Sequence, residues 1–177
     1  TIAGGKGFGT HPHDNMEIIT IPLEGDLEHK DNIGNGAIIK NGEIHVMSAG
    51  TGITHSEFNA NAEKDVKLLQ IWLFPNKRNV KPRYDQLSLQ SIKKNDEFYQ
   101  ILSPYSKDEG VWIHQNAWFS LGEFSHEKKI NYKLNSTKSK LFILSHSVPI
   151  PRRTSKAHFL NLSEATAAKL SRSSVER

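Results

Sequence analysis

The sequence predicts an all-β fold, either a sandwich or a barrel of antiparallel strands, and two observations support this. Short runs rich in Ile, Val, Leu and aromatic residues alternate with turn residues along the first half of the chain. The dipeptide Asn-Gly occurs at Asn35-Gly36 and at Asn41-Gly42. Both dipeptides favour tight hairpin turns, because Asn and Gly tolerate positive φ. Many short strands joined by frequent turns are typical of sandwiches and barrels rather than of parallel α/β sheets.

The expected strands of the first half are the runs MEIITIPLEG, AIIK, EIHVMS and KLLQIWLF, with DNIGNG as a turn between the first two. The following segment, PNKRNVKPRYDQ, has two prolines and alternating charge, which is typical of an exposed connection. A second β-rich block includes VWIHQNAWFSLGEF and KINYKLN. Near the end, LSEATAAKLSRS has helical composition, with Ser163 as its N-cap.

These patterns predict four regions within the 177 residues. We expect an N-terminal β domain over residues 1–75, a linker over 76–98, a C-terminal β domain over 99–145 and a basic tail over 146–177. The length suits two small domains packed together, or one domain with a sizeable core.

Composition and charge exclude several classes of protein. The chain has no cysteine, so disulfides, thiolate metal sites and cysteine nucleophiles are excluded. No apolar run approaches the roughly 20 residues that span a bilayer, and no signal-peptide pattern opens the chain, so we expect a cytoplasmic protein without a membrane partner. The net charge of +4 resides in residues 146–177 and leaves the rest neutral, which does not favour nucleic acid as a partner.

Two histidine motifs carry the chemistry. His11 and His13 are two residues apart in HPH, and His55 and Glu57 are two residues apart in HSE. On an extended strand, side chains at this spacing project from the same face. The glycines of SAGTG allow a sharp turn that can bring the second pair beside the first. Three imidazoles and a carboxylate are suitable ligands for a divalent transition metal.

Other polar residues compete with this set. Glu17 shares the strand parity of His11 and His13, so it rivals Glu57 as the carboxylate ligand, or else orients a histidine ring. We expect His29 in a charged turn, either solvated or near the mouth of a site, and His45 on the surface of an alternating strand. The aromatic residues expected in the core are Trp72, Trp112, Trp118 and Phe119. Two further histidines lack an HxH companion, His114 and His126.

These motifs resemble the cupin superfamily and, more closely, its pirin family. The first cupin motif matches at Gly5, His11, His13 and Glu17, and the second is matched more loosely by Gly42, His55 and Asn59. The pirin pattern is more specific, and from Gly7 to Glu57 the chain carries its elements GFG, HPH, LEG, a charged turn ending in GN, and MSAGTGI followed by HSE. The resemblance covers roughly residues 4–90, and residues 90–145 more loosely.

The resemblance implies a bicupin, in which two jelly-roll barrels of the double-stranded β-helix type lie in one chain and the N-terminal barrel holds the metal. It implies His11, His13, His55 and Glu57 as the ligands, which ranks Glu57 above Glu17. It favours Fe(II) as the cofactor, although the same donor set accepts Ni, Cu, Mn or Zn.

Two departures from the family pattern bear on the fold. The chain begins at Thr1, shortly before HPH, whereas pirins have several strands ahead of this motif. After Leu144 the expected strands are replaced by the basic tail, which is either genuine or the result of a reading-frame change. We therefore expect an incomplete first barrel and a disrupted second one, with exposed sheet edges.

Pirin-like proteins resemble quercetin 2,3-dioxygenases, so the implied activity is cleavage of a flavonol-like phenol with O2. Glu57 would act as the catalytic base as well as a ligand. The residues expected to line the apolar mouth of the site are Phe8, Met16, Ile18 and Met47. The alternative is a non-enzymatic, metal- or redox-sensing regulatory protein that binds a protein partner, and the four ligands alone do not separate the two.

Overall fold

The fold is taken from a computed structural model, which describes residues 1–125. Within these residues the chain forms strands β1 to β11 and one short 3-10 helix, so the all-β prediction is confirmed. The same residues contain no helix long and apolar enough to cross a membrane. Four predicted features lie outside the described residues: the second part of the 99–145 domain, His126, the 146–177 tail and its helix.

The first sheet holds the histidine motifs. Its strand order is β1-β6-β3-β4, and every neighbouring pair is antiparallel. The strands are β1 (Gly7–His13), β6 (Ile53–Asn59), β3 (Leu27–Asp31) and β4 (Gly36–Ile39). Along β6, every second residue is buried. Because alternate strand residues share a face, His55 and Glu57 point to the same side of this sheet.

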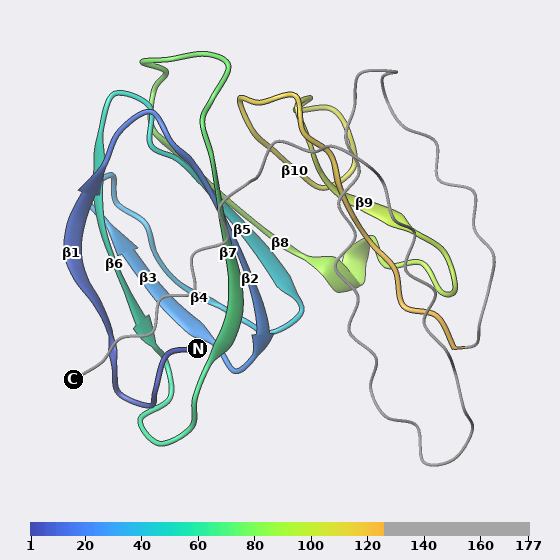
Figure 1. The fold of residues 1–177 in the computed structure, drawn as a ribbon, viewed down its shortest axis with the longest axis horizontal. Helices are drawn as coiled ribbons and strands as arrows, with labels where there is room; N and C mark the ends of the chain where they lie inside the picture. Colours follow the sequence, from blue (N-terminus) through green and yellow to red (C-terminus); the bar gives the residue numbers. More distant parts are fainter. Residues whose placement is uncertain (126–177) are drawn as a thin grey trace, which may run out of the picture. The chain divides into compact units, whose positions relative to one another are not determined.

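The second sheet has the order β7-β2-β5-β8 and is also antiparallel throughout. Its strands are β7 (Lys67–Leu73), β2 (Glu17–Glu24), β5 (Glu43–Ser48) and β8 (Arg83–Ser88). Figure 1 shows the two sheets beside one another. Side chains join them: the rings of His29 on β3 and Tyr84 on β8 lie 5.1 Å apart.

The two sheets do not close into a complete barrel. Within residues 1–125, no strand ladder joins β1 to β7 or β4 to β8. A single antiparallel bridge pairs Ile2, which precedes β1, with Val66, which directly precedes β7. The expectation of open sheet edges therefore agrees with the strand pairing.

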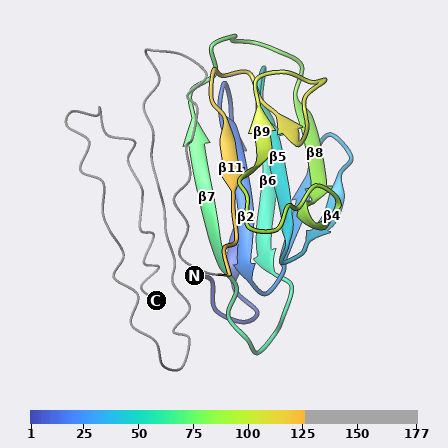
Figure 2. The ribbon, with the colours of Figure 1, turned by 90° about the vertical axis from the view of Figure 1, so that its right-hand side faces the viewer.

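The main core lies on the other face of the second sheet. A three-stranded sheet with the order β10-β9-β11 packs there, formed by β10 (Val111–Trp112), β9 (Tyr99–Ser103) and β11 (Phe119–Leu121) (Figure 2). Buried side chains of β2 and β5 join those of β9 and β10 in one cluster. Strands β2 and β5 are thus covered on both faces, which explains why MEIITIPLEG is a continuous apolar run rather than an alternating one.

The segment predicted as a linker, 76–98, includes β8, which pairs with β5, and a short helix at Leu89–Ser91. Strand β8 follows Pro82, and its register places Tyr84 opposite Met47. The charged residues Lys77, Arg78 and Lys81 precede β8, and the two within the strand, Arg83 and Asp85, form an ion pair of 2.7 Å. The four domain boundaries themselves stay a prediction.

The two Asn-Gly dipeptides differ in their roles. Asn35 ends the turn between the paired strands β3 and β4 and Gly36 begins β4, so the turn residue with positive φ is Gly34 rather than Gly36. Gly42 has φ +83°, as its turn requires, but the strands on either side, β4 and β5, belong to different sheets. The second dipeptide therefore makes a tight turn between sheets and not a hairpin.

Candidate metal centre

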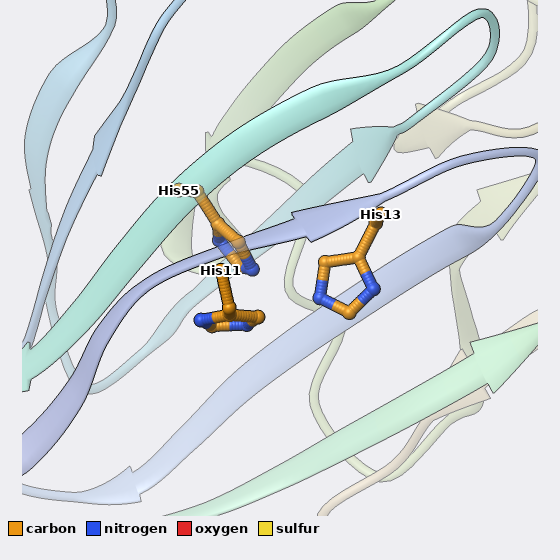
Figure 3. A group of neighbouring side chains, drawn as sticks. All are labelled: His11, His13 and His55. Atoms are coloured by element: carbon orange, nitrogen blue, oxygen red, sulfur yellow. The ribbon is translucent and has the colours of Figure 1, made fainter.

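Three of the predicted ligands meet in space. His11 on β1 and His55 on β6 are register partners, and His13 lies two residues further along β1. The ring centroids are 4.4 Å apart for His11 and His55, 4.9 Å for His11 and His13, and 5.0 Å for His13 and His55. One ligand atom from each residue lies within 4.8 Å of the others. Figure 3 shows the three side chains converging from the two strands.

Local sequence explains how the two strands reach this position. Pro12 keeps His11 extended, because the residue before a proline avoids the helical region. The turn before β6 depends on Gly50 and Gly52, with φ values of +51° and +133°. A Cβ at Gly50 would lie 2.0 Å from the carbonyl oxygen of Val80. The prediction that these glycines allow a sharp turn before His55 is thus confirmed.

The ring nitrogens of this cluster are suitable ligands for a metal ion. The Nε2 atoms of His13 and His55 are buried, and neither has a hydrogen-bond partner in the described structure. Burial, with charge repulsion from His11 as its next cause, lowers the pKa of His55 to about 3. Burial followed by repulsion from His11 also lowers the pKa of His13. Both rings are therefore neutral at pH 7, which is the form that binds metal.

Glu57 lies beside this cluster, on the inner side of β6, and is 2% exposed. The Gln70 amide donates hydrogen bonds of 3.0 and 2.8 Å to its two carboxylate oxygens. Trp72 Nε1 in turn donates to Gln70 Oε1 at 3.2 Å, which fixes the orientation of that amide. Burial raises the pKa of Glu57, and the Gln70 hydrogen bonds oppose that shift.

The carboxylate of Glu57 groups with His55 and His29 within 4.8 Å, and not with the full set of three clustered histidines. The structure thus brings His11, His13 and His55 together and places Glu57 next to His55. Glu57 as a fourth ligand stays a prediction, since its present partner is Gln70.

Sequence reasoning missed two histidines that the structure places in the interior. His29, expected either in solvent or near the mouth of a site, and His45, expected on the surface, are both 0% exposed. The rings of His29 and His45 lie 4.9 Å apart, and Tyr84 lies 4.6 Å from His45. The alternation of side chains along a strand could have shown this. His29 lies two residues from buried Leu27, and His45 lies two residues from buried Met47, so each histidine shares a face with a buried side chain.

Tyr84 completes this interior group of rings. Burial, followed by repulsion from Asp31, raises the pKa of Tyr84 to about 12, so its hydroxyl stays protonated. That hydroxyl donates to Gln86 Oε1. The Tyr84 hydroxyl is therefore polar but uncharged.

Glu17, the rival carboxylate, lies away from the cluster. It starts β2, which belongs to the second sheet, so its parity in sequence with the β1 histidines does not carry over through the intervening turn. Its side chain is buried and accepts a 2.7 Å hydrogen bond from Ser48 Oγ. Neither role considered for Glu17, ligand or orienting partner, is supported by this position.

The apolar residues near the site differ in part from expectation. Ile18 and Met47 are fully buried in a small cluster with Ala49 and Ile53, and Met16 packs against it. Trp72, expected in the core, is 53% exposed, and its ring lies 5.1 Å from that of His13. An open pocket of about 320 Å³ also borders His13, lined by Pro12, His13, Asp14, Asn32, Gly52, Ile53 and Thr54.

The buried histidines make the stability of the metal-free protein depend on pH. Burial, with repulsion from His29 and His55, lowers the pKa of His45 well below its ordinary value. Below pH 6.5 the unfolded chain therefore binds a proton that the folded chain does not, and stability falls as the pH falls. Each such histidine contributes up to about 1.4 kcal/mol per pH unit in this range.

We therefore expect the free energy of unfolding of the metal-free protein to decrease between pH 6.5 and 5, and to decrease less steeply in a His45→Gln variant. Urea titrations at several pH values measure both slopes. Equal slopes for the two proteins would show that His45 is not held neutral by the fold.

Comparison with known proteins gives two family matches. The model of the pirin family matches residues 1–73, and the model of the quercetinase C-terminal cupin domain matches residues 100–147. The first match lies in the N-terminal part of the chain, and the second follows it after a gap of residues 74–99.

Individual relatives agree with these matches. The chain is 43% identical over 115 residues to the quercetin 2,3-dioxygenase of Escherichia coli K12, covering 65% of this chain and 48% of that protein. It is 36% identical over 107 residues to a pirin-like protein of Caulobacter vibrioides, covering 60% and 46%. The chain thus spans about half the length of these curated relatives.

Among solved structures, the fold is similar to that of the bacterial pirin YhhW from Escherichia coli in complex with nickel(II). The TM-score is 0.60 at 43% identity, and the match covers 65% of this chain and 48% of that chain. The resemblance read from the sequence motifs is therefore confirmed.

Proposed function

Because the chain belongs to the pirin family of the cupin superfamily, we propose that its histidine cluster is the metal centre of a dioxygenase that cleaves flavonol-like phenols with O2. The observation that carries the proposal is the convergence of His11, His13 and His55, with two buried Nε2 atoms that lack partners. The names of the relatives support the reaction class, and the nickel(II) complex of a related pirin supports a metal at this kind of site.

His11, His13 and His55 would hold the ion, with Glu57 as the fourth ligand. Three nitrogens and one carboxylate suit Fe(II), the metal that we favour, and also accept Ni, Cu, Mn or Zn. When bound, such an ion supplies Lewis-acid chemistry, and iron also supplies redox chemistry, toward a phenolic hydroxyl and O2.

Glu57 is the group that we assign to proton transfer. Its carboxylate is buried beside His55, and burial raises its pKa toward the range in which a carboxylate serves as a base near neutral pH. The two hydrogen bonds from Gln70 orient the carboxylate, and Trp72 holds Gln70 in place. Glu57 would accept the proton of the substrate hydroxyl.

Two features near His13 suit a planar, apolar substrate. The pocket of about 320 Å³ is lined by Pro12 and Ile53 together with polar residues that include Asn32 and Thr54. The indole ring of Trp72, a residue that is 53% exposed, lies in edge contact with His13, which makes it a surface for ring stacking.

The cytoplasmic location and a protein partner stay predictions.

The test is O2 consumption by the metal-loaded protein with the flavonol quercetin, beside a His11→Ala/His13→Ala variant. We expect the parent to consume O2 in proportion to the flavonol that disappears, and the variant to consume none above the background. Full metal loading in a folded parent without O2 uptake would overturn the dioxygenase proposal and favour the regulatory alternative.

A further inference from the structure

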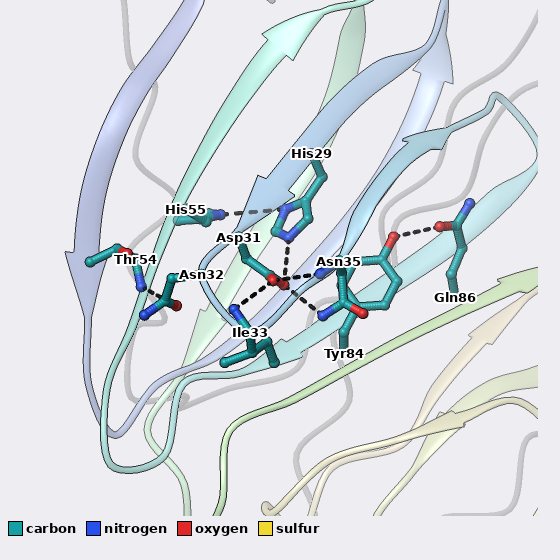
Figure 4. A network of polar contacts seen from close by, with 9 residues as sticks. All are labelled: His29, Asp31, Asn32, Ile33, Asn35, Thr54, His55, Tyr84 and Gln86. Atoms are coloured by element: carbon teal, nitrogen blue, oxygen red, sulfur yellow. Dashed lines mark hydrogen bonds and ion pairs between the residues drawn. The ribbon is translucent and has the colours of Figure 1, made fainter.

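A chain of three side chains runs from the β3–β4 turn to the metal cluster. Asp31 and His55 are register partners on β3 and β6, and His29 lies two residues before Asp31 on β3. His29 Nε2 lies 3.2 Å from Asp31 Oδ2, and His29 Nδ1 lies 3.5 Å from His55 Nδ1 (Figure 4). The side chains of His29 and Asp31 are both 0% exposed.

The turn fixes Asp31 as a hydrogen-bond acceptor. The backbone N–H groups of Ile33 and Asn35 donate to Asp31 Oδ1 at 3.0 and 2.9 Å, and the Asn35 amide donates to Oδ2 at 2.8 Å. Burial alone would raise the pKa of Asp31, but these bonds and the one from His29 outweigh it and lower the pKa. An ionised carboxylate only accepts hydrogen bonds, so the proton between Asp31 and His29 belongs to His29 Nε2.

The proton on His29 Nε2 determines which ring nitrogen of His55 carries a proton. Of the two Nδ1 atoms, 3.5 Å apart, one donates and the other accepts. His29 is the acceptor when its single N–H is the one on Nε2 that faces Asp31, because Nδ1 then has a lone pair. The matching arrangement puts a proton on His55 Nδ1 and leaves the lone pair of His55 on Nε2. His55 Nε2 is the buried atom without a partner, on the ring that contacts His11 and His13.

We propose that His29 and Asp31 are positioning residues that fix the tautomer and ring orientation of His55, so that its Nε2 lone pair faces the histidine cluster. The inference rests on the proposed metal centre and assigns His29 a role that the HPH and HSE motifs do not include. Metal-binding histidines generally donate their second N–H to an acceptor that fixes the ring, and here the acceptor is a second histidine that is itself held by a carboxylate.

A direct test is the tautomer of His55 in the metal-free protein, read from its ¹⁵N chemical shifts after labelling of the histidines. We expect the proton of His55 on Nδ1 in the parent and a shift of population toward Nε2–H in a His29→Phe variant. His29→Asn is the matched control, because its Oδ1 lies near the position of the lost Nδ1 and can accept the same hydrogen bond. A parent whose His55 carries its proton on Nε2 would overturn the inference.

Metal affinity gives the second readout, measured by competition with a chelator. We expect His29→Phe to weaken binding about 10- to 100-fold, the range for lost outer partners, and His29→Asn to retain most of the affinity. Equal affinity for the parent and for folded His29→Phe would contradict the inference. A count of four imidazole ligands by pulsed electron paramagnetic resonance on the Cu(II)-loaded parent would also contradict it, because His29 would then be a ligand beside His11, His13 and His55.

The two proposals fail in different ways. If the parent binds no metal, the proposed metal centre fails, whereas the tautomer in the metal-free protein still decides the inference about His29. If the parent binds metal and His55 has the other tautomer, the inference alone fails.

Discussion

Replacing His55 with alanine is expected to weaken the binding of a divalent metal ion by more than about a hundredfold. His55 is the residue that both groups of potential ligands share, since it contacts His11 and His13 on one side and lies with His29 and Glu57 on the other. A partner outside the ligand set contributes about 10- to 100-fold, so the loss of a direct ligand should exceed that range. Competition titration with Ni(II) and a chelator measures the change.

His114→Ala is the matched control for this experiment. Like His55, His114 lies against other rings, with its own 4.9 Å from that of Trp112, but it belongs to neither group of potential ligands. We expect the control to bind metal as the parent does. Parent-like affinity in a folded His55→Ala protein would show that the ion binds elsewhere.

Replacing Glu57 with glutamine is expected to lower the turnover of a flavonol by about 10²- to 10⁴-fold, the usual contribution of a positioned base. The amide cannot accept the hydroxyl proton, and it lacks the anionic oxygen that a metal prefers. Because the histidine cluster remains, metal at saturating concentration should still bind. Steady-state O2 uptake at full metal loading measures the effect.

Gln70→Ala separates the position of Glu57 from its chemistry. This variant removes both hydrogen bonds to the carboxylate and keeps the carboxylate itself. Since those bonds lower the pKa of Glu57, we expect the acid limb of the pH–rate profile to move to higher pH. Turnover in Glu57→Gln equal to that of the parent would remove the catalytic role assigned to Glu57.

The sequence was sufficient to predict the β architecture and the histidine cluster, because both follow from local patterns. The alternation of side chains puts His11 and His13 on the same face of one strand, and His55 and Glu57 on the same face of another. The register of β1 with β6 then brings the histidines together. The strand β2 and the sharp turn before β6 were likewise predictable from neighbouring residues alone, from an apolar run and from closely spaced glycines.

The remaining features depend on how the sheets pair and pack, which a single sequence does not encode locally. The charged composition of LEHKDN indicated solvent, yet its alternate side chains, His29 and Asp31, point inward toward His45 and Tyr84 on the facing sheet. Sequence parity put Glu17 on the same strand face as His11 and His13, but the chain changes sheets between β1 and β2. The first error arose from reading composition without strand parity, and the second from treating parity as continuous through a turn.

The most direct test of the account is the metal-to-protein ratio of the purified protein after anaerobic loading with Fe(II) or Ni(II), beside the His11→Ala/His13→Ala variant. Elemental analysis should give close to one ion per chain for the parent and almost none for the variant, with both proteins folded by circular dichroism. A folded parent without metal, or a variant that retains as much as the parent, would contradict the assignment of the metal centre to these histidines.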